Sequence, residues 1–137
     1  MRSLTLAIGL ALATVATSAA CSKDQPAARR GPGEVSVDEL ARALGAGARA
    51  VDVNGKKLRT DVGVIPGAVL LSDYETFAST ELPADKTQPL VFYCANLQCG
   101  ASHEAASKAL AYGYRDVKVL PAGILGWAEA GQRVDKL

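Results

Sequence analysis

The stretch PLVFYCANLQCGASHEAASKAL, residues 89–110, decides how the rest of the chain is interpreted. Its segment LVFYC, residues 90–94, is apolar throughout, which is typical of a central strand covered on both faces. Residues 102–113 are predicted to form a helix that stops at Gly113. Cys94 therefore stands where a strand ends and the chain turns toward a helix, and Cys99 lies in the connecting loop.

Strands and helices are expected to alternate on both sides of this stretch. Ser36 precedes Glu39 by three residues, a capping-box pattern that begins a helix ending at Gly45. Further strands are predicted at 48–53, after the Pro66-Gly67 turn and at 117–120, with short helices at 72–77 and 123–131. This order predicts an α/β fold with a doubly wound parallel sheet, in which ligands bind beyond the carboxyl ends of the strands. Cys94 is at such an end.

The surroundings of Cys94 bear on its reactivity. A thiol reacts as the thiolate, which a helix N-terminus and backbone N–H groups stabilise. The loop ANLQCGA, residues 95–101, has no charged side chain, and Gly100, Ala95 and Ala101 allow tight curvature. The residue pattern leaves two interpretations open, a functional thiol and an inert buried cysteine.

Several motifs in fixed order resemble those of rhodanese-like domains, over roughly residues 34–134. They are VDV with Asp52, GVIPGA with Val64 in place of the usual His, LVFYC, the helix SHEAASKALAYGY, VKVL, and AGILGWAEAG. The resemblance implies a five-stranded parallel sheet flanked by helices. It also implies a cysteine nucleophile that carries a persulfide sulfur, and Cys94 falls on that position.

The loop departs from the family pattern. Ser102 comes eight positions after Cys94, so the loop is about two residues longer than the usual C-x-x-G-x-R-S, and it contains neither Arg nor Lys. Cys99 stands near the usual Arg position, and Asn54 stands where the first motif often has Arg. The missing Arg argues against phosphatase and arsenate reductase activity, and it predicts that thiosulfate, a dianion, is a poor donor.

The predicted site centres on Cys94 and Cys99 as catalytic residues. A curled loop would bring their Cα atoms within the roughly 4.4–6.8 Å of disulfides. A redox or sulfur-relay pair, a stable disulfide and an unrelated pair all remain open. Ser102 is expected to cap the helix, and Asp52 to hydrogen-bond neighbouring loops. The predicted substrate-binding residues are Ala95, Asn96, Leu97, Gln98, Gly100, Ala101 and Ser102.

His103, the single histidine, is either a general base or a solvent-facing residue of the first helical turn. Cys94, Cys99 and His103 do not have the spacing of a standard zinc site. We therefore expect no metal and no cofactor.

The N-terminus has the layout of an export signal, with Arg2, an apolar run from Leu4 to about Val15 and small residues before Cys21. The run is short of the roughly 20 residues of a membrane-spanning helix. TSAAC resembles the lipobox of bacterial lipoproteins, which implies cleavage before Cys21 and lipidation of this residue. We expect a signal peptide at 1–20, a flexible tether at 21–33 and a rhodanese-like domain at 34–137.

The resemblance to bacterial lipoproteins also implies a destination. Ser22 rather than Asp follows Cys21, which favours the outer membrane, with the domain facing the periplasm. Without residues 1–20 the chain has 14 basic and 14 acidic residues, so nothing suggests nucleic-acid binding.

The sequence thus predicts a lipid-anchored sulfurtransferase or thiol–disulfide protein. Its partners would be a small sulfur donor or an acceptor thiol, together with a reductant protein. The alternative is a non-catalytic binding or scaffold domain of the same fold.

Overall fold

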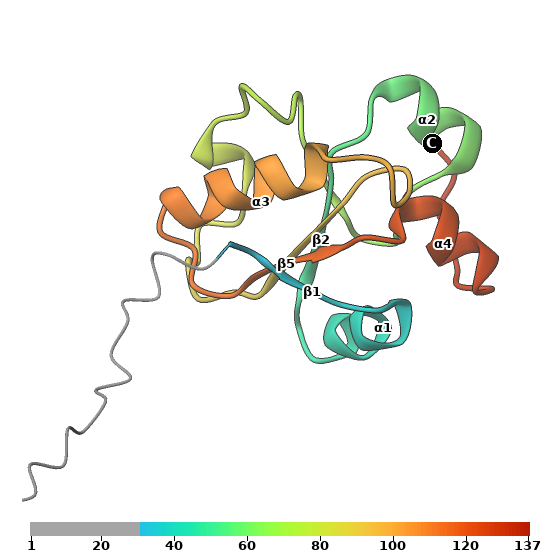
Figure 1. Cartoon of the computed structure of the whole chain (residues 1–137), viewed down its shortest axis with the longest axis horizontal. Coiled ribbons are helices and arrows are strands. Elements are labelled where there is room, and N and C mark those ends of the chain that lie inside the picture. Colours follow the sequence, from blue (N-terminus) through green and yellow to red (C-terminus); the bar gives the residue numbers. More distant parts are fainter. Residues whose placement is uncertain (1–30) are drawn as a thin grey trace, which may run out of the picture.

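The computed structural model describes residues 31–137, which form one parallel sheet with helices on both faces (Figure 1). The sheet has five strands in the order β1-β5-β4-β2-β3, and every pair is parallel. This confirms the predicted fold class. The strands are β1 (Gly33–Glu34), β2 (Arg49–Asp52), β3 (Val69–Leu70), β4 (Leu90–Tyr93) and β5 (Val117–Leu120). The helices are α1 (Val37–Gly45), α2 (Lys56–Val62), the 3-10 helix η2 (Ser79–Glu81), α3 (Ala101–Ala111) and α4 (Gly123–Glu129).

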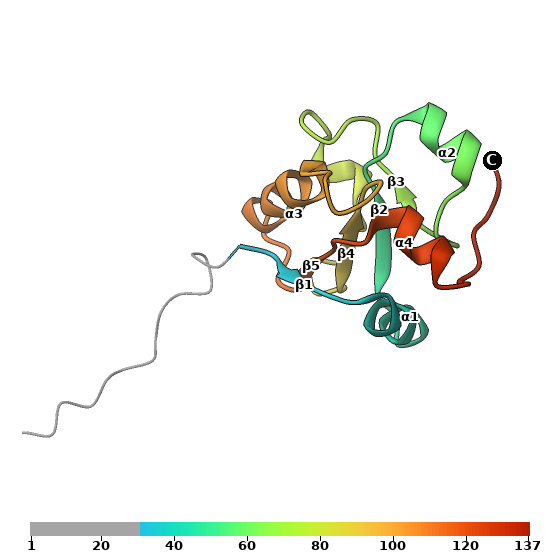
Figure 2. The same ribbon diagram turned by 45° about the vertical axis from the view of Figure 1, so that its right-hand side comes forward.

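The two faces of the sheet carry separate apolar cores, because side chains alternate along a strand. In β4, Leu90 and Phe92 belong to the core under α3, which also contains Phe77 and Leu82. Val91 and Tyr93 belong to the opposite core, which α1, α2 and α4 cover through side chains such as Leu40, Leu58 and Ile124. Figure 2 shows α3 on one side of the strands and α1 and α4 on the other. Burial on both faces explains why LVFY is apolar without alternation.

Several predicted boundaries are confirmed. The Ser36 side chain accepts from the Glu39 amide, and the Glu39 carboxylate accepts from the Ser36 amide, so the capping box begins α1. The strand predicted at 117–120 is β5.

The segment 72–77 is not the predicted short helix. The Asp73 carboxylate accepts from the amides of Glu75 and Thr76 and holds the chain in a turn. The Ser72 hydroxyl donates to Glu81 instead of capping a helix. Asx turns of this kind compete with helix formation for the same backbone groups.

Three elements were not predicted: α2, the 3-10 helix η2 and the short edge strand β1. Strand β1 pairs with β5 through Gly33 and Glu34, so the sheet begins one residue before the predicted domain boundary. The predicted signal peptide, Cys21 and most of the tether lie outside the described residues. None of the helices between residues 31 and 137 combines the length and apolar character that crossing a bilayer requires.

Candidate active-site loop

Cys94 follows β4 and is 2% exposed. Its backbone is held from the far side of the loop by the first turn of α4. The amide of Ile124 donates to the Cys94 carbonyl at 2.9 Å, and the amide of Leu125 donates to the Ala95 carbonyl at 3.1 Å. The strand end that carries the sulfur is therefore fixed by a helix that follows it by about thirty residues in the chain.

Gly123 allows α4 to come close enough for these two hydrogen bonds. It has a φ of +62°, and a Cβ atom here would lie 2.4–2.6 Å from backbone atoms of Cys94 and Ala95. Gly100 differs, because its φ is −85° and a Cβ atom would meet nothing within 4 Å. The tight curvature expected of Gly100 is therefore not what the loop requires, and the glycine that the site needs lies in α4. Gly123 is part of the motif AGILGWAEAG, so the sequence offered a way to find it.

The structure pairs the sulfur atoms of Cys94 and Cys99 as a disulfide, with the two Cα atoms 6.3 Å apart. This separation lies within the range of protein disulfides. Cys99 is partly exposed and packs against the core that contains Cys94. The loop thus brings together the two cysteines that sequence analysis singled out, with one sulfur buried and the other nearer the surface.

Ser102 lies beside the cysteine pair but does not cap α3, so that prediction is wrong. The helix begins one residue earlier than expected, and its N-cap is Gly100, which offers no side-chain hydrogen bond. Ser102 is buried, and its Oγ lies 3.4 Å from Cys94 Sγ. Its hydroxyl is therefore placed to donate to an anionic sulfur on Cys94.

Two backbone amides of the loop donate to Asn96 rather than to the sulfur. The amide of Cys99 donates to the Asn96 carbonyl at 3.2 Å, and the amide of Gln98 donates to the Asn96 side chain at 3.1 Å. The Cys99 carbonyl oxygen, an acceptor, lies 3.2 Å from Cys94 Sγ. A carbonyl oxygen cannot donate a hydrogen bond, so in this position it gives no stabilisation to negative charge on Cys94 Sγ.

The other predicted binding residues line the loop at different depths. Ala95, Asn96 and Ala101 are half-buried, whereas Gln98 and Gly100 are exposed. Leu97 is 73% exposed between the two cysteines. These residues surround the pair in sequence, and among the predicted site residues Cys99 and Ser102 have polar atoms within hydrogen-bond distance of Cys94 Sγ.

His103 pairs with the edge strand β1. Its Nε2 lies 3.2 Å from Glu34 Oε1 on the edge strand β1. Among residues 31–137 no three His, Cys, Asp or Glu side chains gather in a way that would hold a metal ion.

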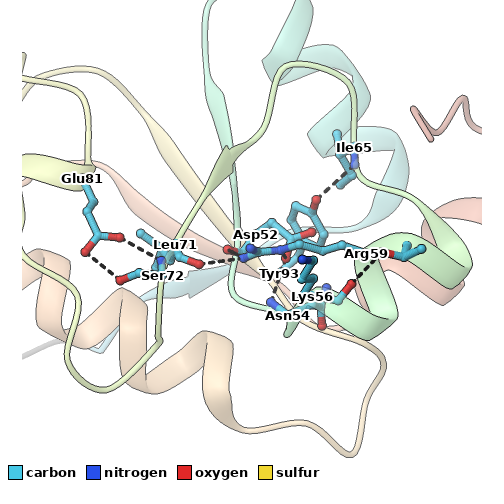
Figure 3. A network of polar contacts seen from close by, with 10 residues as sticks. Asp52, Asn54, Lys56, Arg59, Ile65, Leu71, Ser72, Glu81 and Tyr93 are labelled. Atoms are coloured by element: carbon cyan, nitrogen blue, oxygen red, sulfur yellow. Dashed lines mark hydrogen bonds and ion pairs between the residues drawn. The ribbon is translucent and has the colours of Figure 1, made fainter. Parts of the chain in front are cut away.

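A buried polar network occupies the end of the neighbouring strand β2 (Figure 3). The Arg59 Nε donates to Asp52 Oδ1 at 3.0 Å, and Nη2 donates to the carbonyls of Asp52 and Leu71 at 3.0 and 2.9 Å. The Asn54 amide donates to the same Asp52 oxygen. Asp52 thus bonds neighbouring segments as expected. Arg59 was missed, because helix α2 brings it back to Asp52 across seven residues.

Tyr93 completes this network from β4. Its hydroxyl accepts from the Ile65 amide at 3.0 Å. Burial, together with the Asp52 carboxylate, raises the pKa of Tyr93 well above its usual range. Tyr93 therefore stays neutral and links β4 to the segment after α2.

The model of the rhodanese-like domain matches residues 36–130. The chain belongs to the rhodanese-like family. This confirms the resemblance seen in the motifs. No curated protein is similar enough to match the chain.

Solved structures agree on the fold of this rhodanese-like domain. The BH2092 protein of Bacillus halodurans is 23% identical, with a TM-score of 0.66 over 76% of this chain and 77% of that one. The RPA3614 protein of Rhodopseudomonas palustris, described as a possible tyrosine phosphatase, is 22% identical with a TM-score of 0.59 over 76% and 85%. SseA of Escherichia coli, from a study of 3-mercaptopyruvate sulfotransferases, is 18% identical with a TM-score of 0.61 over 77% and 51%.

Proposed function

We propose that this rhodanese-like protein handles sulfane sulfur through a persulfide on Cys94, with Cys99 as the resolving or relay thiol. The observation that carries the proposal is the contact of Cys94 Sγ with both Cys99 and the Ser102 hydroxyl at the carboxyl end of β4. A sulfur with a second cysteine and a hydroxyl donor beside it, next to a helix N-terminus, suits nucleophilic sulfur chemistry. The sulfotransferase link of SseA, a protein of the same fold, adds support.

The Cys94 thiolate attacks the terminal sulfur of a donor, and the rest of the donor leaves as an anion. An acceptor thiol then removes the sulfur, or the Cys99 thiolate attacks Cys94 Sγ, expels hydrosulfide and closes the disulfide. In the second route an external thiol reductant returns both cysteines to the reduced state.

The second candidate is a non-catalytic binding domain. The observation that favours it is the absence of a cation from residues 94–102, where the family pattern has Arg. Arg59 does not fill this gap, since its Nε and Nη2 are bonded to Asp52 and Leu71.

Mass spectrometry of the reduced protein after exposure to a sulfur donor separates the two candidates. We expect a persulfide mass on the wild type, none on Cys94→Ser, and a longer-lived persulfide on Cys99→Ser. Sulfur loading that survives Cys94→Ser but is lost in Cys99→Ser would show that Cys99, not Cys94, is the nucleophile. No loading from any donor would support the binding domain.

The proposal includes export and a lipid anchor on Cys21, supported by the apolar run and TSAAC in the sequence. It favours the outer membrane, facing the periplasm. We expect the native protein to lack residues 1–20 and to incorporate labelled fatty acid. Cys21→Ser should leave an unprocessed or soluble product. Lipid labelling that persists in this variant would contradict the anchor.

A further inference from the structure

The two sulfurs of the pair differ in access. Cys94 is 2% exposed and lies in the core under α3, whereas Cys99 is partly exposed on the loop next to Leu97 and Gln98, which face solvent. A thiolate that opens a disulfide attacks one sulfur in line with the S–S bond and expels the other, so the outcome depends on which sulfur it can reach. In the disulfide Cys99 is the more exposed of the two residues, so a thiol from solution meets the pair first on the Cys99 side.

The two sulfurs also differ as leaving groups. The leaving sulfur becomes a thiolate, and a sulfur that the protein stabilises as an anion leaves faster. The Ser102 hydroxyl lies 3.4 Å from Cys94 Sγ, in the first turn of the eleven-residue helix α3, whose N-terminus favours negative charge. The Cys99 carbonyl oxygen, 3.2 Å from Cys94 Sγ in the disulfide, is an acceptor and gives no such stabilisation, so the Ser102 hydroxyl and the helix N-terminus are the groups that favour Cys94 as the leaving thiolate.

We propose that an external thiol reductant enters through Cys99, so that the mixed disulfide forms on Cys99 and Cys94 leaves as the thiolate. This rests on the proposed thiol chemistry of the pair and names the sulfur at which its reductant acts. In the first step one thiolate of the reductant bonds to Cys99 Sγ as the Cys94–Cys99 bond breaks. In the second step another reductant thiolate takes the first away as a disulfide and leaves the Cys99 thiolate.

The order of release has a consequence for turnover. Cys94 regains its nucleophilic form while Cys99 is still blocked by the reductant. During this interval Cys99 cannot discharge a persulfide on Cys94. The reductant therefore protects the sulfur carrier at the moment it becomes reactive.

The test maps the mixed disulfide on the full-length processed protein. The protein is oxidised with diamide, treated briefly with glutathione, quenched with acid and alkylated with N-ethylmaleimide. Both cysteines fall in one tryptic peptide, residues 87–108, so fragment ions between Cys94 and Cys99 must assign each group. We expect glutathione on Cys99 and maleimide on Cys94, in at least about tenfold excess over the reverse arrangement at the earliest times.

Glutathione on Cys94, or an equal distribution at the earliest times, would overturn the proposal, as would an oxidised protein that carries no Cys94–Cys99 bond. Ser102→Ala provides the second measurement. It should keep glutathione on Cys99 but slow the opening severalfold, and an unchanged rate would contradict the role of the hydroxyl. None of these measurements uses a sulfur donor, so they succeed or fail independently of persulfide loading.

Discussion

The neighbouring strands β2 and β4 end side by side in the sheet, and the two ends are built in opposite ways. At the end of β2, Asp52 is fully buried and Arg59 holds it through a guanidinium that is largely buried as well. At the end of β4, residues 94–102 contain no charge, and Leu97 at the loop surface is 73% exposed. The buried cation Arg59 thus supports the scaffold at the end of β2, while the cysteine loop at the end of β4 has only neutral side chains.

The largest expected effect comes from breaking the β2 end. Arg59→Ala would leave the Asp52 carboxylate buried without its cation, which costs about 3–5 kcal/mol of unfolding free energy. Chemical denaturation of both proteins measures this loss. Lys57→Ala is the matched control on the same helix, because its pair with Asp61 is exposed and contributes about 0.3–0.5 kcal/mol. Equal losses in the two variants would show that the buried pair does not support the scaffold.

The next effect comes from the α4 contact with the β4 end. Gly123→Ala would force a Cβ atom into the backbone of Cys94 and Ala95 at a positive φ, which costs about 1–3 kcal/mol. Because it moves the backbone of Cys94, the proposed nucleophile, sulfur loading of the folded protein should fall as well. Gly100→Ala is the control for stability and should stay within about 0.5 kcal/mol. A Gly100→Ala variant less stable than Gly123→Ala would reverse the roles assigned to the two glycines.

A smaller effect is expected at the Ser102 hydroxyl. Ser102→Ala removes a hydrogen bond to an anionic sulfur, an interaction of about 1.5 kcal/mol, so alkylation of Cys94 in the reduced protein should slow about tenfold. The measurement is the rate of iodoacetamide reaction at Cys94 as a function of pH. Cys99 should react at its wild-type rate and serves as the internal control. An unchanged rate at Cys94 would mean that the loop stabilises its thiolate without this hydroxyl.

The smallest effect tests the missing charge directly. Gln98→Arg adds a cation to the exposed loop, and an exposed ion pair contributes at most about 1 kcal/mol, so the KM for thiosulfate should fall by a few-fold. Gln98→Glu should raise it. The assay is sulfur transfer from thiosulfate at low salt. A wild-type protein already saturated at micromolar thiosulfate would show that the loop does not need the cation.

Elements with a strong local signal were predicted from the sequence. In each of these elements, residues close together in the sequence determine the local structure. They are the four apolar residues of β4, the VKVL strand and the Ser36 capping box. Helix α2 was missed because Gly55, which cannot cap with a side chain, precedes it and no residue in it is fully buried. Strand β1 has only two exposed residues and depends on its pairing with β5.

In the site, too, residues with a local sequence signal could be predicted and residues that depend on the fold could not. Cys94 and its pairing partner could be named from motif and spacing. The role of Ser102 could not, because a serine near a helix start fits a cap as well as a contact to sulfur, and Gly100 takes the cap position. Arg59 and Gly123 act on the site only through the fold, one by the return of α2 to β2 and the other by the approach of α4 to the loop.

The direction of the sheet has a consequence for how an anchored protein would present its site. The chain enters β1 at Gly33, opposite Lys118 near the start of β5, and therefore at the amino edge of a sheet whose strands all run the same way. The Cys94 loop leaves from the carboxyl edge, about 13 Å away along a four-residue strand. A lipid on Cys21 would attach the chain to the membrane through the amino edge, on a tether of at most about 40 Å. The attachment point and the cysteine pair would then lie at opposite edges of the sheet, so the attachment would leave the pair open to a reductant or sulfur donor from solution.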